Sequence, residues 1–187
     1  MQRQISYRPM TPDDGQALVR LHRRSILLDG VRAYTPDLAR SWAFGLEPNG
    51  YAQSAAAGEA LEVALFRGAV IGFCGTQHGE ITGLYVDPAF TRIGAASGLM
   101  RRALKRIHAE GHDRARVTAA MSGVPFYEAM GFHALRGRLH PTRGGSTMRV
   151  LEMVRAFEPL TLPALTVRAP PSPPYGGEGS LQPALAP

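Results

Sequence analysis

The stretch ITGLYVDPAFTRIGAASGLM, residues 81–100, predicts a strand that passes into a helix through a turn of very small residues. Its apolar residues alternate as far as Val86, as in a strand with one buried face, and Asp87 and Pro88 end that pattern. The turn around Gly94 carries few side-chain atoms, so its backbone can approach another molecule closely. The stretch therefore indicates a contact between the main chain and a ligand.

A helix over residues 95–110 points to an anionic ligand. The first amides of a helix have no partners inside it, and with the positive end of the helix dipole they attract negative charge. Arg92 adds a cation beside these amides. The helix also has a basic side, made up of Arg101, Arg102, Lys105 and His108. We predict a phosphate site that uses neither G-x-x-x-x-G-K-[ST] nor G-x-G-x-x-G, because both motifs are absent from the sequence.

The remaining pattern predicts an α/β (α+β) fold with a mixed, mostly antiparallel sheet of six to seven strands and helices on both faces. Thr11 can cap the first helix, Arg67 and Gly68 form a hairpin joint, and Gly111 and Gly131 end two later helices. Strands are expected at residues 5–10, 61–66, 69–77, 80–86 and 114–120, with two more around 142–145, and helices at 11–28, within 29–59, at 95–110 and at 124–130.

Length and composition indicate one globular domain without a disulfide framework. The chain has 187 residues, and its single cysteine, Cys74, lies in an apolar run and is interpreted as a small buried hydrophobic residue. Eight of the 15 prolines fall in residues 159–187, which show no apolar periodicity. We therefore expect a folded domain over residues 1–158, followed by a disordered tail rich in proline and glycine.

Charge and hydropathy restrict the partners. The net charge of +6 suits an anionic partner. A nucleic-acid module would array its basic residues with exposed aromatic residues, and here the basic cluster instead follows the small-residue turn. No apolar run approaches the roughly 18 residues that cross a bilayer, and the N-terminus lacks the apolar core of a signal peptide. We expect a cytoplasmic protein that binds neither nucleic acid nor a membrane.

Two segments resemble motifs of the GNAT superfamily of N-acyltransferases. YVDPAFTRIGAAS, residues 85–97, is similar to the loop that binds the pyrophosphate of acyl-CoA, roughly [QR]-x-x-G-x-[GA] after a strand that ends in V-x-P. Gly94 and Ala96 match this pattern, whereas Thr91 stands where the family has Gln or Arg, and the neighbouring Arg92 could substitute for it. VPFYEAMGF, residues 124–132, resembles the family segment F-Y-E-x-x-G-F. The element order fits the GNAT fold over about residues 4–157.

The resemblance implies that the chain binds acetyl-CoA and no metal. In the family, the strand before the loop bulges and separates from its neighbour, and its exposed backbone binds the pantetheine arm as an added strand would. By position, Leu84, Tyr85 and Val86 would supply that backbone. The pyrophosphate would lie on the turn and helix start, that is, on Arg92, Ile93, Gly94, Ala95, Ala96 and Ser97. A 3′-phosphate could use Arg101, Arg102 or Lys105.

Catalytic roles also follow from the resemblance. Tyr127 matches the family tyrosine that reaches the sulfur, and a phenol can protonate the departing thiolate at neutral pH. Glu80 begins the strand that binds the cofactor and would remove the amine proton, directly or through water, or would equally be a solvated glutamate at the strand end. His78 is a nearby alternative base. The backbone amide of Val86 would stabilise the developing negative charge.

The acceptor is expected to be a primary amine of a small molecule or peptide, bound by residues 22–55. Tyr34 and Trp42 could line its pocket, although Trp42 could equally be core. His22, Arg23 and Arg24 could meet an acidic acceptor, but they are interpreted as a solvated helix face. The alternative function is a non-catalytic acyl-CoA sensor, which would keep the loop and lack the acid. A homodimer is possible.

Overall fold

The computed structural model describes residues 5–157, which form one seven-stranded sheet in the order β1-β2-β3-β4-β5-β7-β6. Neighbouring strands are antiparallel except for β4 and β5, which are parallel. The predicted mixed, mostly antiparallel sheet is therefore confirmed. The strands are β1 (Ile5–Pro9), β2 (Ala60–Phe66), β3 (Ala69–Gln77), β4 (Glu80–Val86), β5 (Arg114–Ala120), β6 (His133–Pro141) and β7 (Thr147–Ala156). The predicted tail, residues 159–187, lies outside the described residues.

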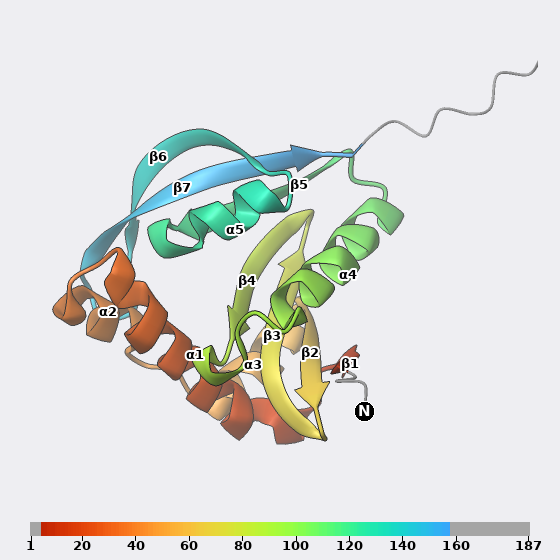
Figure 1. Cartoon of the computed structure of the whole chain (residues 1–187), viewed down its shortest axis with the longest axis horizontal. Helices are drawn as coiled ribbons and strands as arrows, with labels where there is room; N and C mark the ends of the chain where they lie inside the picture. Colours follow the sequence, from red (N-terminus) through yellow and green to blue (C-terminus); the bar gives the residue numbers. More distant parts are fainter. Residues whose placement is uncertain (1–4, 158–187) are drawn as a thin grey trace, which may run out of the picture.

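Helices cover both faces of the sheet, as expected from the sequence. The α-helices are α1 (Gly15–Asp29), α2 (Pro36–Ala43), α3 (Pro48–Ala56), α4 (Ala95–Ala109) and α5 (Val124–Ala129). One buried cluster joins the sheet to α4 and α5, and a second joins β2, β3 and β4 to α1, α2 and α3. Figure 1 shows the red and orange helices α1, α2 and α3 apart from the green α4 and α5. None of these described helices is both long and apolar enough to cross a bilayer.

The helix α4 forms where its apolar spacing predicts. Its buried face includes Leu99, Met100, Leu104 and Ile107, and each such side chain contributes about 1.5–3 kcal/mol when it leaves water. The helix ends before Gly111, whose φ of 87° is a conformation that favours glycine. This packing fixes the start of α4 against the end of β4.

The first helix begins later than predicted. Thr11 caps a short 3₁₀ turn over Pro12–Asp14, and α1 follows it. The Asp14 carboxylate accepts a hydrogen bond from the Thr11 amide at 2.8 Å and two from the Arg8 guanidinium at 2.6 and 2.8 Å. The Arg8 guanidinium holds the pKa of Asp14 at about 2, below its ordinary value. These bonds tie the entry of α1 to β1.

The sheet opens between β4 and β5. These two strands pair only through Glu80 with Arg116 and Ile81 with Val117. Immediately afterwards the register of β3 against β4 shifts, so that Thr82 is an extra residue without a partner, a β-bulge. The bulge and the separation expected from the GNAT resemblance are therefore confirmed.

The β6–β7 hairpin reaches back to α2 with its tip. The Gly144 amide donates to the Ser41 carbonyl at 2.8 Å, and the Ser41 and Thr142 hydroxyls are 2.6 Å apart. The Arg143 guanidinium donates to the Trp42 carbonyl at 3.2 Å. In Figure 1 the blue tip of the hairpin meets the orange α2, which brings residues about a hundred positions apart into contact.

Candidate active site

The turn before α4 has the backbone form of an anion site. Gly94 caps the helix with φ of 93° and ψ of 1°, and no side chain caps its first turn. The first hydrogen bond inside the helix runs from the Gly98 amide to the Gly94 carbonyl at 2.9 Å. This leaves the amides of the residues between them without intrahelical partners. The structure thus brings the predicted cofactor residues 92–97 together at one helix start, where Arg92 is exposed.

The basic side chains of α4 differ in whether they pair with a carboxylate of the described chain. Arg102 forms an ion pair with Glu62 at 2.6 Å and lies over the Tyr7 ring. Arg101 and Lys105 are exposed, and in the described part of the chain neither has a carboxylate partner. Of the three residues suggested for a 3′-phosphate, these two are therefore the better placed.

Alternate residues of β4 have their main-chain groups on the side of the opening between β4 and β5. The Asp87 amide donates to the Ile71 carbonyl at 2.8 Å, which continues the β3–β4 ladder beyond the strand. Peptide groups of successive strand residues face opposite sides, so the backbone of Tyr85 faces β3 while those of Leu84 and Val86 face the opening. Only two of the three residues expected to bind pantetheine thus have their main-chain groups on the open side.

Tyr127 in α5 is buried on the α4 side of the sheet. Its ring makes edge contacts with Phe126 and Phe132. Burial raises the pKa of Tyr127 far above its ordinary value, and the neighbouring Cys74 and Tyr85 raise it further. The phenol is therefore a neutral proton donor under all ordinary conditions. Cys74 is itself buried, as predicted, and burial raises the pKa of its thiol.

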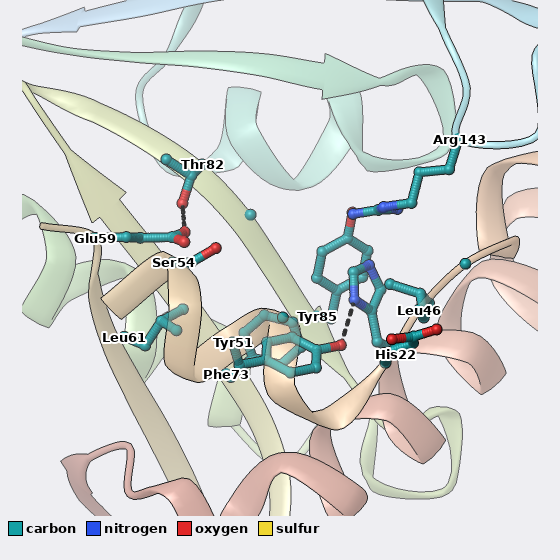
Figure 2. Close-up of a pocket in the computed structure, with 14 residues that line it drawn as sticks. His22, Leu46, Tyr51, Ser54, Glu59, Leu61, Phe73, Thr82, Tyr85 and Arg143 are labelled. Carbon is teal, nitrogen blue, oxygen red and sulfur yellow. Dashed lines mark hydrogen bonds between the residues drawn. The ribbon is translucent and has the colours of Figure 1, made fainter. Parts of the chain in front are cut away.

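A cavity of about 240 Å³ lies on the other face of β4. Its walls come from α1, α3, the segment between α2 and α3, strands β2 to β4 and the tip of the β6–β7 hairpin (Figure 2). The lining residues are His22, Gly45, Leu46, Glu47, Gly50, Tyr51, Ser54, Glu59, Leu61, Phe73, Thr82, Gly83, Tyr85 and Arg143. The acceptor region expected at residues 22–55 supplies about half of this wall.

An aromatic cluster forms one side of the cavity. The His22 ring centroid is 3.8 Å from that of Tyr85, and its Nδ1 is 2.9 Å from the Tyr51 hydroxyl. His22 is 4% exposed, and its Nε2 is buried without a hydrogen-bond partner among the described residues. Burial, aided by Arg143, lowers the pKa of His22 to about 3, and burial raises the pKa of Tyr85 to about 12. His22 is therefore a neutral polar group facing the cavity.

Charged groups stand at both ends of the cavity. The Glu59 carboxylate accepts a hydrogen bond from the Thr82 hydroxyl at the β4 bulge, and a side chain at Gly75 would occupy its position. Figure 2 shows this pair on one side and the Arg143 side chain reaching in from the other. Glu47, before α3, is a second carboxylate in the wall.

Glu80, the predicted base, lies beside the opening but does not line the cavity. Its carboxylate accepts a hydrogen bond from the Thr118 hydroxyl of β5 at 3.3 Å, at the last residue pairs before the strands part. His78, the alternative base, is exposed in the β3–β4 turn with φ of 48°. The structure therefore brings Glu80 near the opening and leaves His78 in the turn.

Several other expectations about the acceptor region change. The Tyr34 hydroxyl donates to the Arg149 carbonyl at 2.6 Å and accepts from the Met121 amide at 2.8 Å, so it holds elements together and does not line the cavity. Trp42 packs on Gly30, as core. The interpretation of residues 22–24 as a solvated face holds for Arg23 and Arg24, which are exposed, and was wrong for His22. His22 is buried, Arg23 donates to the Leu46 carbonyl, and Arg24 pairs with Asp87 at 3.4 Å.

Sequence reasoning missed the contributions of Glu59, Thr82 and Arg143 to the cavity. No local motif marks any of them, and Glu59 and Arg143 are far apart in the chain. The bulge expected in the strand was the one signal for Thr82. Among the described residues no cluster of histidine, cysteine or carboxylate side chains is arranged to hold a metal ion.

Comparison with known proteins gives a consistent result. The acetyltransferase (GNAT) domain family model matches residues 31–148. The uncharacterized N-acetyltransferase YafP of Escherichia coli (strain K12) is 26% identical over 140 residues, covering 75% of this chain and 89% of YafP.

Two solved structures share the fold. A GCN5-related N-acetyltransferase from Rhodopseudomonas palustris superposes with a TM-score of 0.77 at 19% identity, covering 84% of this chain and 99% of that one. PaiA N-acetyltransferase from Thermoplasma acidophilum, in complex with coenzyme A, superposes with a TM-score of 0.63 at 20% identity, covering 82% and 99%.

Proposed function

This chain belongs to the GNAT family of acetyltransferases, and on that premise we propose that it transfers the acetyl group of acetyl-CoA to a primary amine of a small molecule or peptide. The observation that carries the proposal is the opening between β4 and β5. The start of α4, which no side chain caps, lies at one end of it, and a cavity with charged walls lies on the other face of β4. A donor and an acceptor could approach one another there from the two faces of the sheet.

The chain has groups suited to coenzyme A. When bound, acetyl-CoA supplies an acetyl group activated as a thioester. The amides of residues 95–97, with Arg92, would hold the pyrophosphate, and Ile93 and Gly94 would shape the turn. Leu84 and Val86 would hydrogen-bond the pantetheine arm through the backbone. Arg101 and Lys105 carry the charge to receive a 3′-phosphate.

Two side chains have chemistry suited to moving protons. We assign Tyr127 as the general acid, because it matches the family tyrosine that reaches the sulfur and because burial raises the pKa of its phenol, which keeps the proton available. Glu80 is the proposed base, acting through a water molecule because it stands beside the cavity and not in its wall. The Val86 amide, on the open side of β4, would stabilise negative charge that develops on the acetyl oxygen.

The rival function is an acyl-CoA sensor, and one assay separates the two. Purified protein is incubated with acetyl-CoA and a panel of amines and short peptides, and thiol release and acetylated product are both measured. Product formation with any amine supports the transferase. Saturable acetyl-CoA binding in calorimetry with no product across the panel would favour the sensor.

Two further proposals concern the cellular location and the oligomeric state of the protein. A cytoplasmic location rests on the sequence. A homodimer is favoured by the edge strand β6, where Leu135 and Leu139 are 62% and 65% exposed. Light scattering coupled to size-exclusion chromatography tests the dimer, with Leu139→Glu as the variant expected to dissociate it. A monomeric wild-type protein at micromolar concentration would exclude it.

A further inference from the structure

We propose that the acceptor is an amino carboxylate: a primary amine joined through an apolar chain or ring to a carboxylate that Arg143 binds. This inference rests on the proposed transferase function and names the substrate class of the same site. It follows from the arrangement of charge in the cavity, where a carboxylate and a guanidinium stand at different ends of a wall that includes aromatic side chains.

The Arg143 guanidinium is exposed, is hydrogen-bonded to the protein and has no counter-ion within residues 5–157. Its side-chain hydrogen bond within the described residues goes to the Trp42 carbonyl at 3.2 Å, and the turn that carries it is hydrogen-bonded to Ser41. Elsewhere on the same hairpin, Arg136 and Arg138 both pair with Glu152 at 2.7 Å. Within residues 5–157 no carboxylate pairs with Arg143. A guanidinium has several donors in a planar fork that matches a carboxylate.

His22 supplies an independent sign of a polar ligand at that end. Its Nε2 is buried and unpartnered in the described chain, although its Nδ1 is occupied by the Tyr51 hydroxyl. A buried polar atom without a partner costs about 1–3 kcal/mol, so such atoms mark places where a ligand completes the bonding. Figure 2 shows the Arg143 side chain reaching toward His22, so both groups serve one end of the cavity.

Glu59 defines the opposite end. Its carboxylate is held by the Thr82 hydroxyl at the bulge, where β4 leaves β5, and it has no cationic partner among the described residues. An ammonium group would be attracted there, beside the opening through which the acetyl group would be presented. Between the two ends the wall is aromatic and aliphatic, with Tyr51, Phe73 and Leu61, which favours an apolar spacer.

A diamine is the rival acceptor, because Glu47 adds a second carboxylate to the wall. Glu47 and Arg143 are both exposed, but the Arg143 side chain reaches in toward His22 and Tyr85, on the side opposite Glu59 (Figure 2). A second ammonium group at the end opposite Glu59 would therefore meet the Arg143 guanidinium. These observations favour an amino carboxylate as the acceptor, and the experiment therefore includes a diamine as the rival.

The test compares matched pairs of amines that differ only in the carboxylate. The probes are 6-aminohexanoate with hexylamine, 4-(aminomethyl)benzoate with benzylamine, and 1,6-diaminohexane as the rival. The carboxylate is several bonds from the nitrogen, so the amine pKa changes little within a pair and kcat/KM reports on binding. We expect each amino carboxylate to exceed its partner by roughly 10- to 100-fold, the effect of a hydrogen bond to a charged group.

Arg143→Met removes the charge and keeps most of the stem, and Arg149→Met is the matched control. Arg149 lies on β7 and does not line the cavity. Arg143→Met should bring the ratio within each pair close to one, and Arg149→Met should leave it unchanged. Equal rates within each pair in the wild type, a preference for 1,6-diaminohexane, or a ratio that survives Arg143→Met would overturn the inference.

A second arm separates this inference from the transferase proposal. Calorimetry of 6-aminohexanoate into CoA-saturated protein needs no turnover. Saturable binding that Arg143→Met weakens by roughly 10- to 100-fold supports the amino carboxylate even if no amine is acetylated. Absence of binding to folded protein that has bound CoA overturns it, whether or not other amines react.

Discussion

The Glu59 carboxylate is hydrogen-bonded to the Thr82 hydroxyl at the bulge where β4 leaves β5. Two residues earlier on β4, Glu80 is hydrogen-bonded to Thr118 across the last pairs that join the two strands. Two carboxylates therefore flank the opening, one in the cavity wall and one beside it. They are expected to divide two tasks, holding the ammonium group and removing its proton.

Substitution of each carboxylate separates these tasks. Glu80→Gln should lower kcat by roughly 10²- to 10⁴-fold, the usual contribution of a general base, and alter the acidic limb of the rate profile. Glu59→Gln should chiefly raise KM for the amine, because it removes a binding charge. Steady-state kinetics across pH measures both. Should Glu80→Gln keep its wild-type profile while Glu59→Gln loses the acidic limb, the base is Glu59.

Tyr127→Phe tests the proposed acid. The ring and its packing stay, so affinity for acetyl-CoA should be unchanged, while kcat should fall by roughly 10²- to 10⁴-fold. Burial raises the pKa of Tyr127, so the wild-type profile should show no alkaline limb from this group up to about pH 9.5. Near-normal turnover of the Phe variant would remove Tyr127 from the mechanism and leave the fold and the cofactor site intact.

Gly94→Ala tests the loop, with Gly111→Ala as its control at the other end of α4. Both glycines have positive φ, 93° and 87°, and neither has an atom within 4 Å of an added Cβ. Both substitutions should therefore cost roughly 1–2 kcal/mol of backbone strain and lower the melting temperature alike. Only Gly94→Ala should weaken CoA binding in calorimetry, by tenfold or more, because the pyrophosphate would meet the added carbon. Equal affinities of the two variants would exclude the loop.

The buried His22 predicts a pH dependence of folding. Its pKa is lowered to about 3 in the folded protein, against about 6.5 when unfolded. Between these values the unfolded chain binds a proton that the folded chain does not. The stabilisation is therefore complete above pH 6.5 and is lost as pH falls toward 3. At pH 5.5 the loss is about 1.4 kcal/mol relative to pH 7.5.

Urea denaturation of wild type and His22→Gln at both pH values measures this effect. The other histidines are common to both proteins, so the difference between the two pH shifts isolates His22. We expect the wild type to lose about 1.4 kcal/mol more than His22→Gln. Parallel losses in the two proteins would show that His22 is protonated in the folded state.

The features that the sequence alone determined are local ones. Alternation up to Val86, the glycine at position 94 and the apolar face of α4 lie within about 25 consecutive residues. Backbone geometry and hydrophobic spacing act over that range, so they predict a strand, a turn and a helix in the right order. The order of the elements predicted the mixed sheet, whereas the family and the separation of β4 from β5 came from the resemblance of residues 85–97 and 124–132 to GNAT motifs.

The cavity was decided only by tertiary structure. In the sequence, His22 belongs to a polar part of the helix. In the structure it lies against Tyr85, because it is on the same side of α1 as Leu18, Leu21 and Ile26, which pack in the core. Arg143 enters the cavity because the tip of the β6–β7 hairpin is hydrogen-bonded to Ser41, which is about a hundred residues away in the sequence. Such contacts depend on how helices and strands pack against one another. The spacing of residues along one helix or strand does not predict which others it will contact.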